Sequence, residues 1–325
     1  MVKPESSYIA FLDMLGTRAA ASSSDQEYTT AINDFNHAIA ICSEVHKGKV
    51  YGYSDNAYVQ FCSLNDLVSF FQSLRDTLML QHHYFCAAAD VGTLSKGPEP
   101  FTQGDNYYSM KFTSDSAVVV YRMQTRYTGI GIFLSHAIVR NLQKEGPEGS
   151  FCNSICLQNN LVNGEFDYLS VYDISYSDVS FDKLKHLLSD YLVTAATNPR
   201  AGRYYVTPII SMIKCCNQDI FGNDSDFKNI INLLSFKSIP KCFQTLSHNE
   251  TYSIYFLFAL IESVLSPIVS ASTSSLDVTN ICETIINNFE IPHEKLIATL
   301  PSIPLSIISE RNKRHFLSIL YNMND

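Results

Sequence analysis

The first strong pattern in the chain is a short apolar run that ends in an acidic residue. Residues 9–12 (IAFL) are followed by Asp13, and Gly16 comes three positions later. An unbroken apolar run predicts a buried strand, here over 8–13. A carboxylate at the end of such a strand is costly unless something charged meets it, and a turn with Gly exposes N–H groups that can face a phosphate. Asp13 is therefore a candidate metal ligand, with a turn former or helix cap as the alternative.

A second acidic residue lies at the tip of a predicted hairpin. The β-rich runs 50–53 and 57–61 flank Ser54, Asp55 and Asn56, which predicts a hairpin with Asp55 at its turn. Taken alone, Asp and Asn are ordinary residues of a hairpin turn. A strand ending in Asp, a helix-length segment and this hairpin can together bring two carboxylates close. Two metal ions about 4 Å apart on such a pair are the machinery of in-line phosphoryl displacement, and Mg²⁺ and Mn²⁺ prefer carboxylate oxygens.

The remaining periodicity predicts two domains. In residues 1–177 the order βαββαβ followed by αβαββ predicts an α/β (α+β) domain, a mixed sheet covered by helices. From 178 to 325 helical periodicity predicts a helical domain that serves packing, dimer support or regulation.

In the first domain, Asp25 is the expected cap of the first helix. The expected helices are 27–46, 65–82, 107–126 and 135–144; the further strands are 84–92, 129–134, 151–157 and 166–172, with a loop at 95–106 and a turn at Asn163-Gly164. The later helices are expected near 180–196, 204–216, 225–236, 252–265, 277–289 and 305–322.

Composition narrows the class of protein. An apolar content of 46% in 325 residues is ample for a core and argues against disorder. The net charge of −9 argues against a nucleic-acid partner. Nine scattered cysteines without a CxxC pair predict a reduced, cytoplasmic protein, and we see no secretory signal. Glu262 and Pro267 interrupt the most apolar late segment, 254–269, so we expect no membrane insertion.

The two acidic motifs resemble those of a known family. FLDMLG (11–16) and YGYSDNAYV (51–59), whose aspartates are 42 positions apart, look like the core of class III nucleotidyl cyclases and, more narrowly, of the bacterial pyrimidine cyclases of Pycsar antiphage systems. The resemblance covers about residues 5–175. It implies attack of a ribose 3′ oxygen on the α-phosphate with loss of pyrophosphate. It also implies two metal ions, Mn²⁺ or Mg²⁺, on Asp13, Asp55 and the Met14 carbonyl, with the backbone of Met14, Leu15, Gly16 and Thr17 facing the phosphates.

The resemblance also points to a residue that selects the base. The family sets base choice four positions before the hairpin aspartate, where purine enzymes have Lys or Glu. Here the residue is Tyr51, which matches the pyrimidine cyclases and offers a hydroxyl and a ring that can stack or narrow the pocket. The alternative is an ordinary aromatic residue of a strand. Tyr53 and Tyr58 remain further candidates for contact with the base.

A cation is expected on a later helix. Class III enzymes carry an Asn and, four residues later, an Arg; the segment 114–126 (SDSAVVVYRMQTR) places Arg122 at the Arg position and Val118 at the Asn position. The resemblance implies that Arg122 stabilises the developing charge, with a solvated surface arginine as the alternative, and Arg126 and Lys111 remain other candidates. In the family two chains pair head to tail, and the Arg comes from the chain opposite the aspartates.

The resemblance implies a homodimeric, metal-dependent pyrimidine nucleotide cyclase that converts UTP to cyclic UMP, with CTP as the second choice. The product would act on a separate effector in antiphage defence. A purine cyclase stays open, because Tyr51 is a single position. An inactive cyclase-like module that senses a nucleotide also stays open, since the family's Asn is replaced by Val118.

Overall fold

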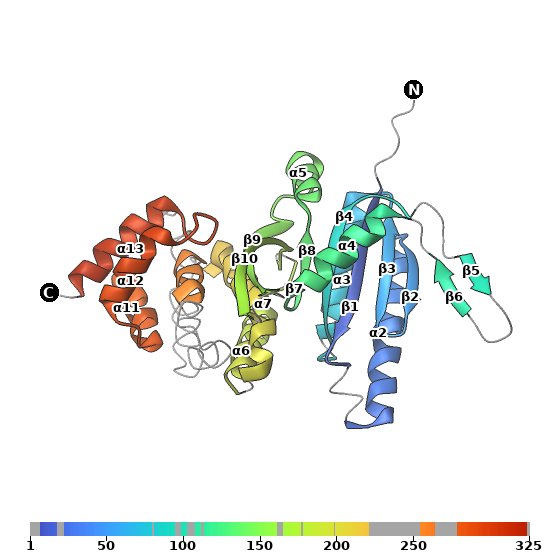
Figure 1. Cartoon of the computed structure of the whole chain (residues 1–325), viewed down its shortest axis with the longest axis horizontal. Coiled ribbons are helices and arrows are strands. Elements are labelled where there is room, and N and C mark those ends of the chain that lie inside the picture. Colours follow the sequence, from blue (N-terminus) through green and yellow to red (C-terminus); the bar gives the residue numbers. More distant parts are fainter. Residues whose placement is uncertain are drawn as a thin grey trace. The chain divides into compact units, whose positions relative to one another are not determined.

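The structure is a computed structural model of one chain (Figure 1). It describes residues 7–17, 23–79, 81–94, 99–102, 108–111, 114–160, 165–176, 178–197, 199–220, 254–263 and 278–323. The chain divides into two compact units. The first is Met1–Phe151 with Tyr172–Ile174, and the second is Cys152–Val171 with Ser175–Asp325. The domain boundary predicted at residue 177 stays a prediction.

A mixed sheet forms the centre of the first unit. Strand β1 (Tyr8–Leu15) lies between β3 (Asn56–Phe61) and β4 (Tyr84–Val91) and is antiparallel to both. Strand β2 (Lys49–Tyr53) extends the sheet beyond β3, and β8 (Gly131–Leu134) pairs parallel with β4. The predicted class of fold, a mixed sheet covered by helices, is confirmed.

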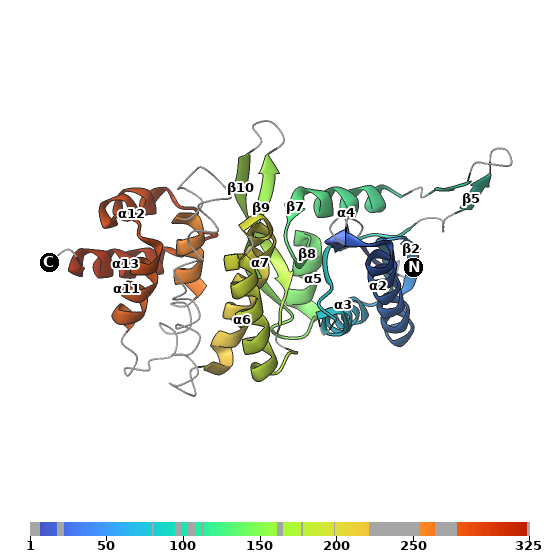
Figure 2. The same ribbon diagram turned by 90° about the horizontal axis from the view of Figure 1, so that it is seen from below.

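Helices cover both faces of this sheet. Helices α2 (Asp25–Val45), α3 (Leu64–Met79) and α5 (His136–Glu145) bury their apolar sides on one face, and α4 (Asp115–Arg126) lies on the other (Figure 2). Since side chains alternate along a strand, Leu12 of β1 joins the core beneath α2 and α3, whereas Phe11 packs towards α4. Ala88 of β4 lies opposite Phe11, and this small side chain leaves room for the helix.

Three local expectations need correction. Ser24 caps α2 in place of Asp25, because its Oγ accepts the Glu27 N–H at 3.1 Å. Part of the expected loop forms strand β5 (Glu99–Thr102), and the start of the helix expected at 107 forms strand β6 (Tyr108–Lys111), which pairs with β5. The short strand β7 (Tyr127–Thr128) follows α4 directly. Pairing between two short strands overrides the local helical pattern here.

The second unit begins with strands β9 (Phe151–Asn160) and β10 (Glu165–Ile174), apart from the few residues assigned to the first unit, and is otherwise mainly helical. Glu262 ties the helix over 254–263 to the last helix: its carboxylate accepts the Ser309 N–H at 3.0 Å and the Asn312 amide at 2.9 Å. The expected helix 225–236 and the turn at 163–164 lie outside the described residues. No helix in the described part of the chain is long and apolar enough to cross a membrane. The helices are α6 (Phe181–Thr197), α7 (Pro199–Ile220), α11 (Val278–Phe289), α12 (His293–Thr299) and α13 (Glu310–Asn322), with a 3-10 turn, η1 (Leu300–Ser302).

Candidate functional site

The predicted hairpin forms and is fixed against the end of β1. Ser54 and Asp55 make a two-residue turn between β2 and β3, with Ser54 at φ 49°. The backbone N–H of Met14 donates to the carbonyl oxygen of Asp55 at 2.8 Å. From the side of α2, the amide of Asn36 donates to the carbonyl of Ser54 at 2.9 Å. The position of Asp55 next to Asp13 is therefore set by backbone hydrogen bonds and strand pairing.

The charge of Asp55 acts on the carboxylate of Asp13. Asp13 is half-buried at the end of β1, and its register partner in β3 is Asn56, the neighbour of Asp55. Burial, with the nearby charge of Asp55, raises the pKa of Asp13 from 3.8 to about 6; a hydrogen bond from Gln124 opposes this rise. A neighbouring negative charge disfavours the ionised form of a carboxylate, and here the effect falls on Asp13. The fold therefore concentrates negative charge at one point.

This pair has the right chemistry for a hard divalent cation. Carboxylate oxygens are the ligands that Mg²⁺ and Mn²⁺ prefer, and a bound cation would relieve the repulsion between Asp13 and Asp55. No three His, Cys, Asp or Glu side chains cluster anywhere in the described residues. A metal at this pair would thus complete its shell with backbone carbonyl, water or substrate oxygens, as Mg²⁺ does at nucleotide sites. Met14, the third predicted ligand, is the next residue of β1, and its side chain is buried on the opposite face of the sheet.

The turn after β1 has the predicted open backbone. Gly16 is exposed and adopts φ +88°, a conformation that a residue with a Cβ rarely takes. An added Cβ would meet nothing within 4 Å, so the constraint lies in the backbone. Leu15 and Thr17, the other predicted phosphate contacts, flank Gly16 and are half-buried. The turn is accessible to a ligand.

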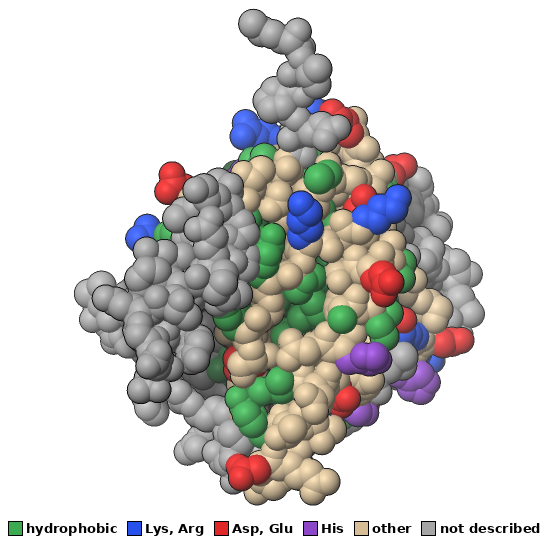
Figure 3. Space-filling model, turned by 90° about the vertical axis from the view of Figure 1, so that its right-hand side faces the viewer, with side chains coloured by type: hydrophobic (Ala, Val, Ile, Leu, Met, Phe, Trp, Pro, Cys, Tyr) green, Lys and Arg blue, Asp and Glu red, His purple; other side chains and the backbone are tan. Residues whose placement is uncertain are grey.

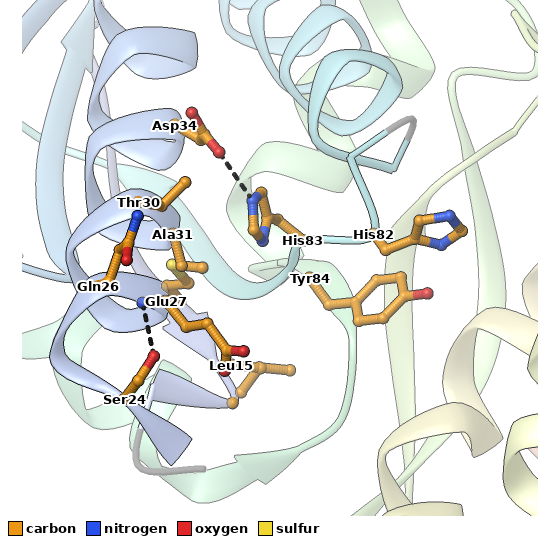
Figure 4. A pocket seen from close by; sticks show the side chains of 12 residues that line it. Leu15, Ser24, Gln26, Glu27, Thr30, Ala31, Asp34, His82, His83 and Tyr84 are labelled. Carbon is orange, nitrogen blue, oxygen red and sulfur yellow. Dashed lines mark hydrogen bonds and ion pairs between the residues drawn. The ribbon is translucent and has the colours of Figure 1, made fainter. Parts of the chain in front are cut away.

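A cavity of about 710 Å³ adjoins this turn, and no pattern in the sequence predicts it. Leu15 and Gly16 line one part, and side chains of α2 and of the residues leading into β4 line the rest. Figure 4 shows the ring of His83 pointing at Asp34 of α2, 3.3 Å away. Glu27, also from α2, lines the cavity near Leu15. The wall therefore carries two acidic side chains, Glu27 and Asp34, and two histidines, His82 and His83. A highly charged anion would need cations with it to enter.

Tyr51 lies on the same face of the sheet as Asp13. It pairs with Tyr58 across β2 and β3, and Tyr58 pairs with Phe11 of β1, two residues before Asp13. The rings of Tyr58 and Tyr121 lie 4.8 and 5.3 Å from that of Phe11. Burial raises the pKa of Tyr58, and the hydroxyls of Tyr53 and Tyr121 add to the rise. An aromatic surface thus extends from Asp13 toward β2.

Figure 3 shows the side of the molecule at the right of Figure 1, where β2 and α2 lie. Hydrophobic side chains form an open strip there. Among the described residues on this side, basic and acidic side chains are scattered around the strip, whereas histidine side chains gather at the lower right of the view.

The predicted arginine lies on the outer side of α4. Arg122 and Arg126 are exposed, whereas the side chain of Lys111 lies outside the described residues. Val118, one turn before Arg122, is also exposed, at 48%, and Val119 and Tyr121 are 41% and 48% exposed. Within one chain, Arg122 and the buried Gln124 therefore lie on different sides of the helix, and only Gln124 contacts Asp13.

Sequence reasoning missed Gln124 and the cavity residues Glu27, Asp34 and His83. A signal for Gln124 existed, because it follows Ala117 and Val120 at helical spacing on an otherwise apolar side. The cavity residues carry no such signal, since His83 and Asp34 are 49 positions apart and meet only in the fold.

Comparison with known proteins gives matches to solved structures alone. The sequence matches no protein-family model, and no curated protein matches it. The guanylyl cyclase Cya2 is 13% identical with a TM-score of 0.36, covering 52% of this chain and 91% of its own. The adenylyl cyclase CyaB from P. aeruginosa is 12% identical with a TM-score of 0.35, covering 52% and 93%. An adenylate cyclase from Trypanosoma brucei is 10% identical with a TM-score of 0.38, covering 53% and 88%. Identities this low do not transfer an activity to this chain.

Proposed function

We propose that this chain is a metal-dependent nucleotide cyclase that converts UTP to 3′,5′-cyclic UMP and pyrophosphate. The observation that carries the proposal is that strand pairing and the Met14 N–H bond to the Asp55 carbonyl place Asp55 beside Asp13, next to the open turn at Gly16. The two residues come from separate elements 42 positions apart. Holding two carboxylates together is costly for an isolated fold, and a site that binds a cation and a polyphosphate accounts for the arrangement.

Separate groups of the chain would bind the metal ions and the triphosphate. Asp13, Asp55 and the carbonyl of Met14 would hold two divalent ions, Mn²⁺ or Mg²⁺. Such ions would lower the pKa of the 3′ hydroxyl and balance the negative charge of the triphosphate. The N–H groups of the turn Leu15–Thr17 would bind phosphate oxygens, because a turn with an exposed glycine presents its amides to a ligand.

The base would bind against the aromatic surface that starts at Tyr51. Its ring can stack on the base, and its hydroxyl can hydrogen-bond to the base edge. Tyr51 and Asp13 share a face of the sheet, which places a nucleotide's base and its phosphates on the same side. UTP is our first choice of substrate and CTP the second. A role in cytoplasmic antiphage signalling, with a separate effector for the product, is part of the same proposal.

A second copy of the chain would complete the site. Arg122 is exposed on α4, next to the exposed apolar side chains of Val118, Val119 and Tyr121. Apolar side chains grouped on one helix suit a subunit interface. In a head-to-tail homodimer, Arg122 would stabilise charge on the phosphates bound by the other chain.

One observation favours a different function. Val118 takes the place of the family's Asn and lies exposed on the side of α4 that carries Arg122, so no amide orients the ribose from that position. A cyclase-like module that binds a nucleotide and metal without turnover would tolerate this change.

The test is incubation of the purified protein with each of the four NTPs and Mn²⁺, with products identified by chromatography and mass. Cyclic UMP with pyrophosphate supports the proposal, and cyclic CMP would show that the substrate is CTP instead of UTP. Cyclic AMP or GMP removes the pyrimidine assignment. Metal-dependent nucleotide binding without product, by folded and dimeric protein, supports the sensing module.

A further inference from the structure

Gln124 is a buried polar residue on a helix side that is otherwise apolar. Helix α4 buries three side chains: Ala117, Val120 and Gln124. The first two pack on Ile9 and Phe11 of β1. Gln124 is 6% exposed. A buried amide is costly unless it is hydrogen-bonded, so its partner indicates why it is there.

That partner is the first carboxylate of the candidate site. The Nε2 of Gln124 donates to the Oδ2 of Asp13, with 3.5 Å between the two atoms. The backbone of the same residue is also engaged, because the Cys86 thiol lies 4.0 Å from the Gln124 carbonyl oxygen. Asp13 and Cys86 are register partners in β1 and β4. Gln124 therefore lies over one cross-strand pair and contacts both of its members.

An amide suits this position for electrostatic reasons. It donates a hydrogen bond to Asp13 without adding charge, so the negative charge that would attract a cation remains. A lysine or arginine here would pair with Asp13 and compete with the metal. When a carboxylate binds a metal, a second residue that hydrogen-bonds to this carboxylate fixes its orientation.

We propose that Gln124 is a positioning residue: it orients the Asp13 carboxylate for a divalent cation and ties α4 to the carboxylate pair. This inference rests on the proposed function, since it takes Asp13 and Asp55 to be the metal ligands. It adds that α4 acts within its own chain through Gln124, in addition to any role of Arg122 toward a second copy.

The test measures metal binding without turnover. The full chain is melted at rising Mn²⁺ concentrations in the absence of nucleotide, and the concentration that gives half of the maximal thermal shift is recorded. Loss of an outer partner of a metal ligand typically weakens metal affinity 10- to 100-fold. We expect Gln124→Met, which keeps the side-chain length, to raise this concentration about tenfold. Gln124→Asn keeps a buried amide but shortens its reach, and we expect a change in the same direction.

Two further variants separate the possible outcomes. Gln143→Met makes the same chemical change at an exposed position of α5, and we expect it to leave the Mn²⁺ midpoint unchanged. Asp55→Asn tests the metal site itself. If Asp55→Asn removes the Mn²⁺ response and both Gln124 variants keep the wild-type midpoint, the inference about Gln124 is overturned, even if their melting temperature without metal falls. If Asp55→Asn keeps the response, the proposed metal site fails instead.

Discussion

The backbone N–H of Met14 donates to the carbonyl oxygen of Asp55 across 2.8 Å. This bond joins the residue after Asp13 to the tip of the β2–β3 hairpin, so the two carboxylates are held together by main chain. The arrangement does not depend on a favourable contact between the side chains, which repel each other. A site built this way keeps its shape when one carboxylate is neutralised, and it can therefore be tested by isosteric substitution.

Asp55→Asn keeps the hairpin and removes one charged metal ligand. We expect cyclic nucleotide formation to fall at least 100-fold, because a neutral amide is a poor ligand for Mg²⁺ or Mn²⁺. Product formed per minute with Mn²⁺ and each NTP measures this loss. Asp190→Asn removes the same charge from an exposed position of α6 and serves as the matched control. Wild-type turnover by Asp55→Asn would exclude Asp55 as a ligand.

Neutralising Asp13 should stabilise the metal-free protein. Its pKa is about 6 in the folded chain and 3.8 in the reference state. A raised pKa means that the protonated group contributes stability below pH 3.8, and this contribution is lost as the pH rises through 6. We expect Asp13→Asn to gain stability over wild type progressively between pH 4 and pH 7 when EDTA is present.

Chemical denaturation at each pH, with the difference in unfolding free energy between Asp13→Asn and wild type as the readout, checks this expectation. Asp190→Asn controls for the loss of one negative charge. Added Mn²⁺ at pH 7 should reverse the order, because only wild type retains the full ligand pair. A difference between Asp13→Asn and wild type that stays constant from pH 4 to 7 would contradict the electrostatic account.

Much of this geometry follows from the sequence. The apolar run before Asp13 predicts β1, and the polar turn between two β-rich runs predicts the hairpin; both form. These signals are local, because strand alternation and turn residues act over a few positions. The same reasoning misplaces the start of α4, since 108–111 form a strand that depends on pairing with 99–102.

The contacts that surround the site could not be predicted in the same way. Gln124 and Asp13 are 111 positions apart, and their meeting depends on how α4 lies across β1 and β4. The cavity next to Gly16 likewise requires α2 and the start of β4 to be placed in space. A single sequence predicts which side of a helix is buried, but it does not predict which strand residue lies beneath it.

Tyr51→Phe tests the base site, because it removes only a hydroxyl. If this hydroxyl bonds to the pyrimidine edge, its loss should reduce discrimination between UTP and the purine nucleotides about tenfold, which corresponds to about 1.4 kcal/mol. The ratio of kcat/KM values for UTP and ATP measures the effect. Tyr321→Phe makes the same change on exposed α13. An unchanged ratio in Tyr51→Phe would remove this hydroxyl from base recognition.

Gly92→Ala tests whether the position of α4 affects metal binding by Asp13 and Asp55. An added Cβ at Gly92 would collide with Cβ and Oγ of Ser116, in the first turn of α4. Overpacking of this kind costs about 1–3 kcal/mol, and the easiest relief is a shift of the helix away from β4. Because Gln124 reaches Asp13 from the same helix, we expect both a lower melting temperature and a weaker Mn²⁺ response.

Gly149→Ala is the control, since an added Cβ there meets nothing within 4 Å and any cost comes from its positive φ. It should lower the melting temperature and leave the Mn²⁺ midpoint unchanged. If Gly92→Ala behaves in the same way, the position of α4 and the metal pair are not coupled.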